Sequence, residues 1–279
     1  MDLVEWHNPI LMVITKTRMS GSRALEMIET LPFDGTEVSD TIGFAGVIWL
    51  LWRTDLVQVD VLITTKQEIH AIIRVRSQTL SWIISVIYAS PRFAERCMLW
   101  ENLKLLSNLH DLPLALMGDF NEVISEEEKS RGNPICQRRV RAILDCMNEC
   151  QMMDLGFSRP KFTWINKREL GGLIQCKLDR CWANPSWKAS FPEANVTYLA
   201  GVNSDHYHLL LNLYPNLVVN SIRPFRFQPM WLSHKDFPAI VRKSWEGSDE
   251  DLSGAVSSFT QKTQTWNKEV LGNIFMRKM

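Results

Sequence analysis

Three stretches in the first half of the chain alternate between apolar and polar side chains, at residues 57–63, 69–75 and 80–87. A period of two is typical of strands that bury one face. Because only short polar breaks separate the three stretches, we expect them to pair as antiparallel hairpins. Residues 44–52 form a nearly continuous apolar run, which predicts a further strand buried on both faces.

The spacing of the apolar residues changes after Pro91. Between residues 92 and 110 they recur every three or four positions, which predicts an amphipathic helix, and residues 135–150 return to this period. A short strand is predicted at residues 113–117, and two more strands at 197–213, joined by the polar loop 201–206. We expect strands separated by helices to build a second sheet, so the fold class is α/β or mixed.

The composition is that of a globular chain with a substantial core. Of the 279 residues, 46% are hydrophobic and 22% are charged, which excludes a disordered, collagen-like or coiled-coil chain. Basic and acidic residues number 31 each. This balance argues against a general nucleic-acid coat protein, because sequence-independent affinity comes mainly from Lys and Arg. The six cysteines lack the spacing of a zinc site.

The sequence predicts neither a membrane span nor an amino-terminal signal peptide. The apolar run 44–52 is far shorter than the roughly 20 residues that a span needs. Asp2 and Glu5 precede the short apolar run 9–14, where a secretory signal would carry basic residues. We therefore expect no membrane partner and an intracellular location.

The character of the sequence changes after Tyr214. Residues 216–223 are typical of a linker, and the chain from residue 221 carries nine Lys and Arg against six Asp and Glu, whereas the first 220 residues carry 22 against 25. We predict one domain over residues 1–215 and an appendage over residues 216–279, helical after Asp236.

Two polar motifs stand beside apolar strands. Gly118–Asn121 follows the strand predicted at 113–117, and Ser204–His206 precedes an apolar strand. Each alone is compatible with a simple turn or the polar start of a strand. Together they supply carboxylates for a hard cation, an imidazole and an amide, which is the set of groups that phosphodiester hydrolysis requires.

Four motifs in order carry a resemblance to a known family: Val86–Pro91 (VIYASP), Met117–Glu122 (MGDFNE), Leu178–Arg180 (LDR) and Ser204–His206 (SDH). The sequence resembles the endonuclease/exonuclease/phosphatase superfamily, and most of all the endonuclease domain of plant LINE-type (non-LTR) retrotransposons. The resemblance implies a four-layer α/β sandwich of two mostly antiparallel sheets flanked by helices. It also implies Mg²⁺-dependent cleavage of phosphodiesters, with DNA as the ancestral substrate.

The resemblance assigns a role to six residues. Tyr88 would donate to the phosphate, Asp119 would activate the attacking water, and Asn121 would help to hold both. Asp205 would lie by the metal. His206 would contact the scissile phosphate and would be oriented by Asp179, because a carboxylate fixes the tautomer of an imidazole and favours its charged form.

The sequence departs from the family at the principal metal ligand. Family members carry a Glu in a Glu-Thr-Lys motif, and the matching stretch here is Val13–Lys16 (VITK), with Ile14 in the place of that Glu. An isoleucine offers no oxygen, so we expect Mg²⁺ binding to be weak or absent. We expect Ile14→Glu to strengthen it, with the new carboxylate pointing into a polar cleft. The family's amino-terminal strand, with its Asn, is also expected to be missing.

Residues 223–231 and 266–270 resemble the segment that precedes a reverse transcriptase in these elements, and we expect no reverse transcriptase in this chain. We therefore expect a fragment of a retrotransposon, nuclear if functional. One hypothesis is an impaired metal-dependent DNA endonuclease, and the alternative is a non-catalytic remnant or nucleic-acid-binding module. The site residues do not select DNA, because superfamily branches that act on inositol phosphates, sphingomyelin or poly(A) share them.

Overall fold

The structure is a computed structural model that describes residues 2–17, 19, 21–39, 48–76, 79–158, 160–199, 204–215, 227, 231–232, 234–245, 252–267 and 270. The chain divides into two compact units, one of residues 9–218 and the other of residues 1–8 and 219–279. The predicted loop residues 201–203, the predicted linker 216–223 and residues 44–47 of the predicted buried strand lie outside the described residues.

A six-stranded sheet forms the centre of the larger unit. Its strands, in spatial order, are β4 (Val57–Thr64), β5 (Glu68–Val75), β6 (Ser81–Tyr88), β7 (Leu114–Asp119), β12 (Asp179–Ala183) and β9 (Met153–Asp154). The first three pair antiparallel, which confirms the hairpins predicted from the alternating side chains.

The strand after residue 113 belongs to this same sheet, so the prediction that it helps to build a second sheet was wrong. β7 lies parallel to β6, and α3 (Phe93–Leu109) connects the two strands. The physical reason is the crossover: a helix between two strands carries the chain back along the sheet and allows parallel pairing with the preceding strand.

A second layer of strands packs on one face of the six-stranded sheet. It contains β1 (Leu11–Thr15), β3 (Ile48–Trp52) and β2 (Gly35–Val38) in the order β1-β3-β2, and the hairpin of β13 (Asn195–Leu199) and β14 (His208–Asn212). A core cluster joins the layers, to which β3 contributes Leu50, β5 contributes Ile73 and β6 contributes Ile84. All three side chains are buried, so the two layers share one apolar interior.

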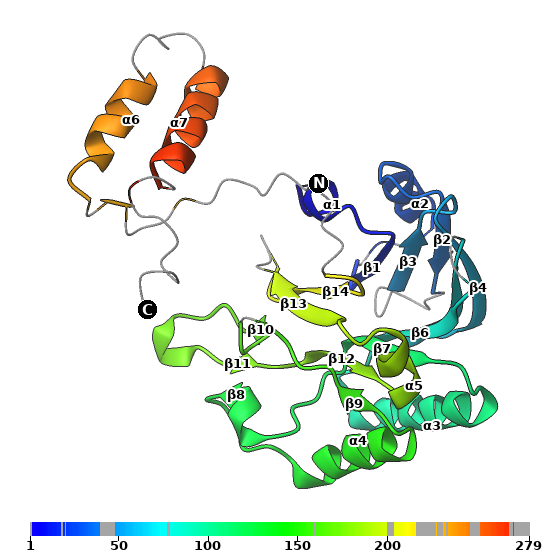
Figure 1. The fold of residues 1–279 in the computed structure, drawn as a ribbon. Coiled ribbons are helices and arrows are strands. Elements are labelled where there is room, and N and C mark those ends of the chain that lie inside the picture. The colour runs from blue at the N-terminus through cyan, green and yellow to red at the C-terminus, as the bar shows by residue number, and fades with distance from the viewer. Residues whose placement is uncertain are drawn as a thin grey trace. The chain divides into compact units, whose positions relative to one another are not determined.

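Helices cover the outer faces of both layers (Figure 1). α3 and α4 (Gln137–Glu149) pack on the six-stranded sheet through a cluster that includes Leu103, Ile143 and Leu116. α2 (Ser22–Glu29) packs on β3 through Ala24 and Trp49. The larger unit is therefore a four-layer α/β sandwich, which confirms the predicted fold class.

The short helix α5 (Pro185–Ser190) begins where Asn184 caps it. The side chain of Asn184 accepts hydrogen bonds from the backbone N–H groups of Trp187, at 2.9 Å, and of Leu114, at 3.0 Å. This cap satisfies a donor at the start of the helix and ties the helix to β7. Trp187 is fully buried and packs edge-on against Trp82, with 6.0 Å between the ring centroids.

The remaining described elements are short strands, the 3₁₀ helices η1 (Glu126–Glu128) and η2 (Leu170–Gly172), and the helices of the smaller unit. β8 (Lys129–Ser130), β10 (Trp164–Ile165) and β11 (Gln175–Cys176) form a small sheet in the order β10-β11-β8. The smaller unit contains α1 (Asp2–His7), α6 (Phe237–Trp245) and α7 (Leu252–Trp266), with a cluster of Trp231, Phe237 and Trp266. The division into domains at residue 215 stays a prediction.

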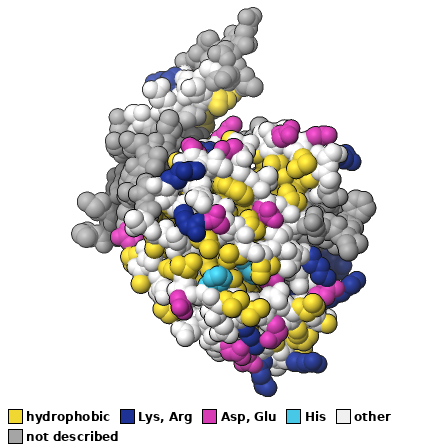
Figure 2. All heavy atoms as spheres, turned by 90° about the vertical axis from the view of Figure 1, so that its right-hand side faces the viewer, with side chains coloured by type: hydrophobic (Ala, Val, Ile, Leu, Met, Phe, Trp, Pro, Cys, Tyr) yellow, Lys and Arg dark blue, Asp and Glu magenta, His cyan; other side chains and the backbone are white. Residues whose placement is uncertain are grey.

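The described surface mixes charge with apolar side chains. On the face shown in Figure 2, acidic and basic side chains are interspersed with hydrophobic ones. Leu25 of α2 and Ile63 of β4 are among the exposed apolar residues. Among the described helices, none has both the length and the apolar character that crossing a membrane requires.

Candidate active site

Three neighbouring strands bring Tyr88, Asp119 and Asp179 into one row. The parallel register of β6 and β7 pairs Tyr88 with Asp119, and the antiparallel register of β7 and β12 pairs Asp119 with Asp179. Residues paired across adjacent strands lie on the same face of a sheet. The row therefore follows from strand register, which places a phenol and two carboxylates side by side.

Asn121 is positioned by its own backbone and by Asp119. Its backbone N–H donates to Asp119 Oδ1 at 2.9 Å, and its Nδ2 donates to the Ala89 carbonyl at 2.8 Å. The residue has a φ of 49°, in the left-handed region that Asn tolerates better than most residues. The chain turns sharply here, and this turn keeps the backbone N–H of Asn121 beside the buried carboxylate of Asp119.

His206 is held by Asp179. The two side chains meet through His206 Nδ1 and Asp179 Oδ2 at 2.9 Å. Thr163 Oγ1 accepts from the backbone N–H of Asp179 at 3.0 Å, and the Tyr198 hydroxyl donates to the Asp179 carbonyl at 2.7 Å. Burial disfavours the charged imidazole, but the hydrogen bond and charge of Asp179 outweigh it and raise the pKa of His206.

Lys16 enters the site from the residue after β1. Its Nζ lies 3.0 Å from Asp119 Oδ2 and 2.7 Å from His206 Nε2, and 5.3 Å from the centroid of the Tyr88 ring. Burial disfavours its charge, but the charge and hydrogen bond of Asp119 outweigh it and raise the pKa of Lys16. Because an ammonium group only donates, the contact with His206 requires an unprotonated Nε2.

Asp205 lies beside the row but uses its carboxylate differently. Its Oδ2 accepts a hydrogen bond from Trp164 Nε1 at 2.9 Å, and its carbonyl accepts from the Ile165 N–H at 2.9 Å. Burial acts to raise the pKa of Asp205, but the Trp164 hydrogen bond and the charge of His206 outweigh it and lower the pKa. Asp205 anchors the turn that carries His206.

Asp119, Asp179 and His206 could together hold a metal ion, because each offers one ligand atom and these atoms lie within 4.8 Å of one another. Each group already has a partner within the protein. Lys16 contacts Asp119 and His206, and His206 contacts Asp179. Mg²⁺ prefers six oxygen ligands in octahedral geometry. With the Lys16 ammonium bound to Asp119 and His206, the arrangement offers Mg²⁺ few of the oxygen ligands that it prefers, so we expect Mg²⁺ to bind weakly.

Ile14 packs against the apolar cluster that includes Ala24, Ile28, Trp49 and Leu51. Our expectation that a carboxylate at position 14 would point into a polar cleft is therefore wrong. The side chain of position 14 is partly buried and packs with residues of α2 and β3, where a carboxylate would lose part of its hydration among apolar side chains.

Sequence reasoning missed two contributors to the site. Lys16 stands in the VITK stretch, but the family resemblance there concerns position 14 and assigns Lys16 no role. Thr163 carries no motif and is fully buried. Its hydroxyl accepts from the N–H groups of Leu178 and Asp179, a role that depends on a contact across 15 or more positions in the chain.

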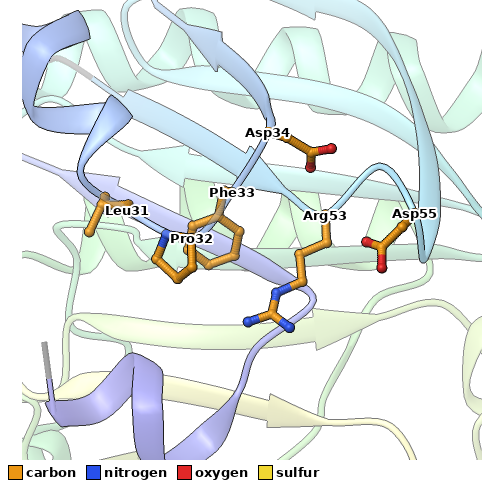
Figure 3. A pocket seen from close by; sticks show the side chains of 6 residues that line it. All are labelled: Leu31, Pro32, Phe33, Asp34, Arg53 and Asp55. Carbon is orange, nitrogen blue, oxygen red and sulfur yellow. The ribbon is translucent and has the colours of Figure 1, made fainter.

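A surface depression lies elsewhere in the larger unit, and it is lined by Leu31, Pro32, Phe33, Asp34, Arg53 and Asp55 (Figure 3). Arg53 lies over the Phe33 ring at 6.0 Å, and Asp34 accepts from the Thr54 N–H at 2.8 Å. None of the predicted site residues lines this depression.

Comparison with known proteins supports the fold. No protein-family model matches the chain, and no curated protein matches it significantly. Among solved structures, it is similar to the endonuclease domain of TRAS1, a telomere-specific non-LTR retrotransposon, with 17% identity and a TM-score of 0.53 over 73% of this chain and 98% of that one.

Two further structures are similar over 76% of this chain, each with 14% identity. One is a 3′ phosphatase from Neisseria bound to a product DNA hairpin, with a TM-score of 0.54 and 91% of that chain covered. The other is a mannosyl-6-phosphatase from Bacteroides thetaiotaomicron, with a TM-score of 0.51 and 87% covered. The chain has the fold of the endonuclease/exonuclease/phosphatase superfamily. Its membership of the plant LINE-type branch is a proposal.

Proposed function

We propose that the chain is a phosphodiester hydrolase of the endonuclease/exonuclease/phosphatase type with DNA as its ancestral substrate, and that its metal-dependent activity is weak. The observation that carries the proposal is the row of Tyr88, Asp119 and Asp179 with His206 held on Asp179 at 2.9 Å. Similarity to a retrotransposon endonuclease and to a phosphatase bound to DNA supports DNA as the substrate class. A retrotransposon origin would place the activity in the nucleus.

Each group in the row has a chemical task under this proposal. The Tyr88 phenol and the Asn121 amide donate to phosphoryl oxygens, and the Asp119 carboxylate accepts a proton from the attacking water. Asp179 keeps the His206 ring oriented toward the scissile phosphate. His206 Nε2 lies 3.8 Å from Asp119 Oδ2, so both groups can reach one phosphate.

The second candidate is a non-catalytic nucleic-acid-binding module. The observation that favours it is the pair of contacts from Lys16, which occupy Asp119 and His206 Nε2. Position 14 supplies no ligand to the site, because Ile14 packs against the apolar cluster beside α2. Under this alternative, the chain keeps the fold and binds nucleic acid without cleaving it.

Nicking of supercoiled plasmid tests the proposal. We expect slow nicking with Mg²⁺, its loss with EDTA, and its loss in Asp119→Asn and His206→Ala. Asp145→Asn makes the same chemical change on an exposed position of α4 and should nick like the wild type. DNA binding without nicking would favour the second candidate, and equal nicking by His206→Ala and the wild type would contradict the proposed site.

A further inference from the structure

Lys16 places a positive charge at the centre of the catalytic row. Its Nζ contacts the Asp119 carboxylate and the His206 ring at 3.0 and 2.7 Å. The side chain of Asp119 is 3% exposed, and that of Lys16 is 35% exposed. The ammonium therefore reaches from a partly open position to a buried carboxylate.

The two atoms that Lys16 contacts are candidate ligands for a metal ion. Asp119 and His206 belong to the described group that could hold a metal, with Asp179 as the third member. A cation bound between Asp119 Oδ2 and His206 Nε2 would compete with the Lys16 ammonium for the same electron pairs. Electrostatic repulsion between two cations in one site adds to this competition.

We propose that Lys16 is the resident cation of this site and that it takes the place of a divalent metal between Asp119 and His206. Removal of the ammonium would then leave Asp119 Oδ2 and His206 Nε2 available to a divalent ion, while Asp179 stays hydrogen-bonded to His206 Nδ1. This mixed donor set suits Mn²⁺ better than Mg²⁺, which prefers oxygen alone. The inference concerns ion binding and goes beyond the proposed hydrolase activity.

The contacts of Lys16 and Asp179 together determine the tautomer of His206. Since the ammonium donates to Nε2, the proton of the neutral ring lies on Nδ1 and is donated to Asp179. The wild-type protein should therefore contain neutral His206 with its proton on Nδ1 at mildly alkaline pH. Long-range ¹H–¹⁵N NMR distinguishes the two tautomers without any substitution.

A calorimetric titration of Lys16→Met with Mn²⁺ tests the inference. We expect the variant to bind Mn²⁺ about tenfold more tightly than the wild type or better, since a unit charge in contact with both ligand atoms is removed. Lys104→Met is the matched control, because Lys104 pairs with Glu101 and Glu149 on α3 and α4. It should bind Mn²⁺ like the wild type.

Lys16→Gln provides a second variant in case Lys16→Met does not fold, because its amide can still donate to Asp119 without carrying charge. It should also bind Mn²⁺ more tightly than the wild type, and Mn²⁺ should raise its Tm. Equal Mn²⁺ affinity in the wild type and the folded variants would overturn the inference. A wild-type His206 with its proton on Nε2 would overturn it as well.

Discussion

Replacement of Gly118 by alanine should destabilise the sheet at the point where Asp119 is positioned. Gly118 pairs with Ile87 in the parallel register of β6 and β7. Its φ is 136°, a conformation that L-residues rarely adopt. A Cβ at this position would overlap the Ile87 carbonyl oxygen and lie 3.0 Å from its carbonyl carbon, so a backbone strand would have to move.

The magnitude follows from two costs. The unfavourable backbone conformation costs about 1–3 kcal/mol, and insertion of a methyl group into a packed region costs about 1–3 kcal/mol. Their sum centres on about 4 kcal/mol, which corresponds to a fall in Tm of roughly 12 °C for a unit of this size. Because Asp119 follows directly, displacement of β7 should also reduce nicking.

Thermal and urea denaturation measure this change, with Gly156→Ala as the matched control. Gly156 also has a positive φ, of 68°, but a Cβ there would meet no atom within 4 Å. The control should therefore lose only about 1–2 kcal/mol, the cost of the backbone conformation. Equal losses in the two variants would refute the role assigned to the contact between Gly118 and Ile87.

Two further predictions concern stability. Burial acts to raise the pKa of Glu128, but its hydrogen bond and ion pair with buried Arg180 outweigh burial and lower the pKa. The wild type should therefore be more stable than Glu128→Gln at neutral pH. The difference in Tm between them should shrink as the pH falls below 4.5 and through the pKa of Glu128 in the folded protein. A difference that grows in acid would contradict this. Deletion of residues 219–279 should leave the Tm of the larger unit nearly unchanged, and a loss of several kcal/mol would show that the tail contributes to its core.

The sequence predicted the elements in which the order of apolar and polar side chains follows the buried and exposed faces of a single strand or helix. The alternation at 57–63, 69–75 and 80–87 marks strands because each residue's polarity follows the face it occupies. The spacing between residues 92 and 110 marks α3 for the same reason. The motifs around Asp119 and His206 indicated which polar groups are candidates for the site, and the structure places both residues in one site.

Tertiary structure decided which of these elements are neighbours. β7 pairs with β6 rather than joining a second sheet, because pairing depends on the path of the crossover helix and not on the strand's own side chains. Gly118 looks like a turn residue in the sequence, yet it lies within β7 and allows the close approach of Ile87. Lys16 meets His206 across 190 positions, and only the folded chain could reveal that contact, since local pattern carries no information on so distant a partner.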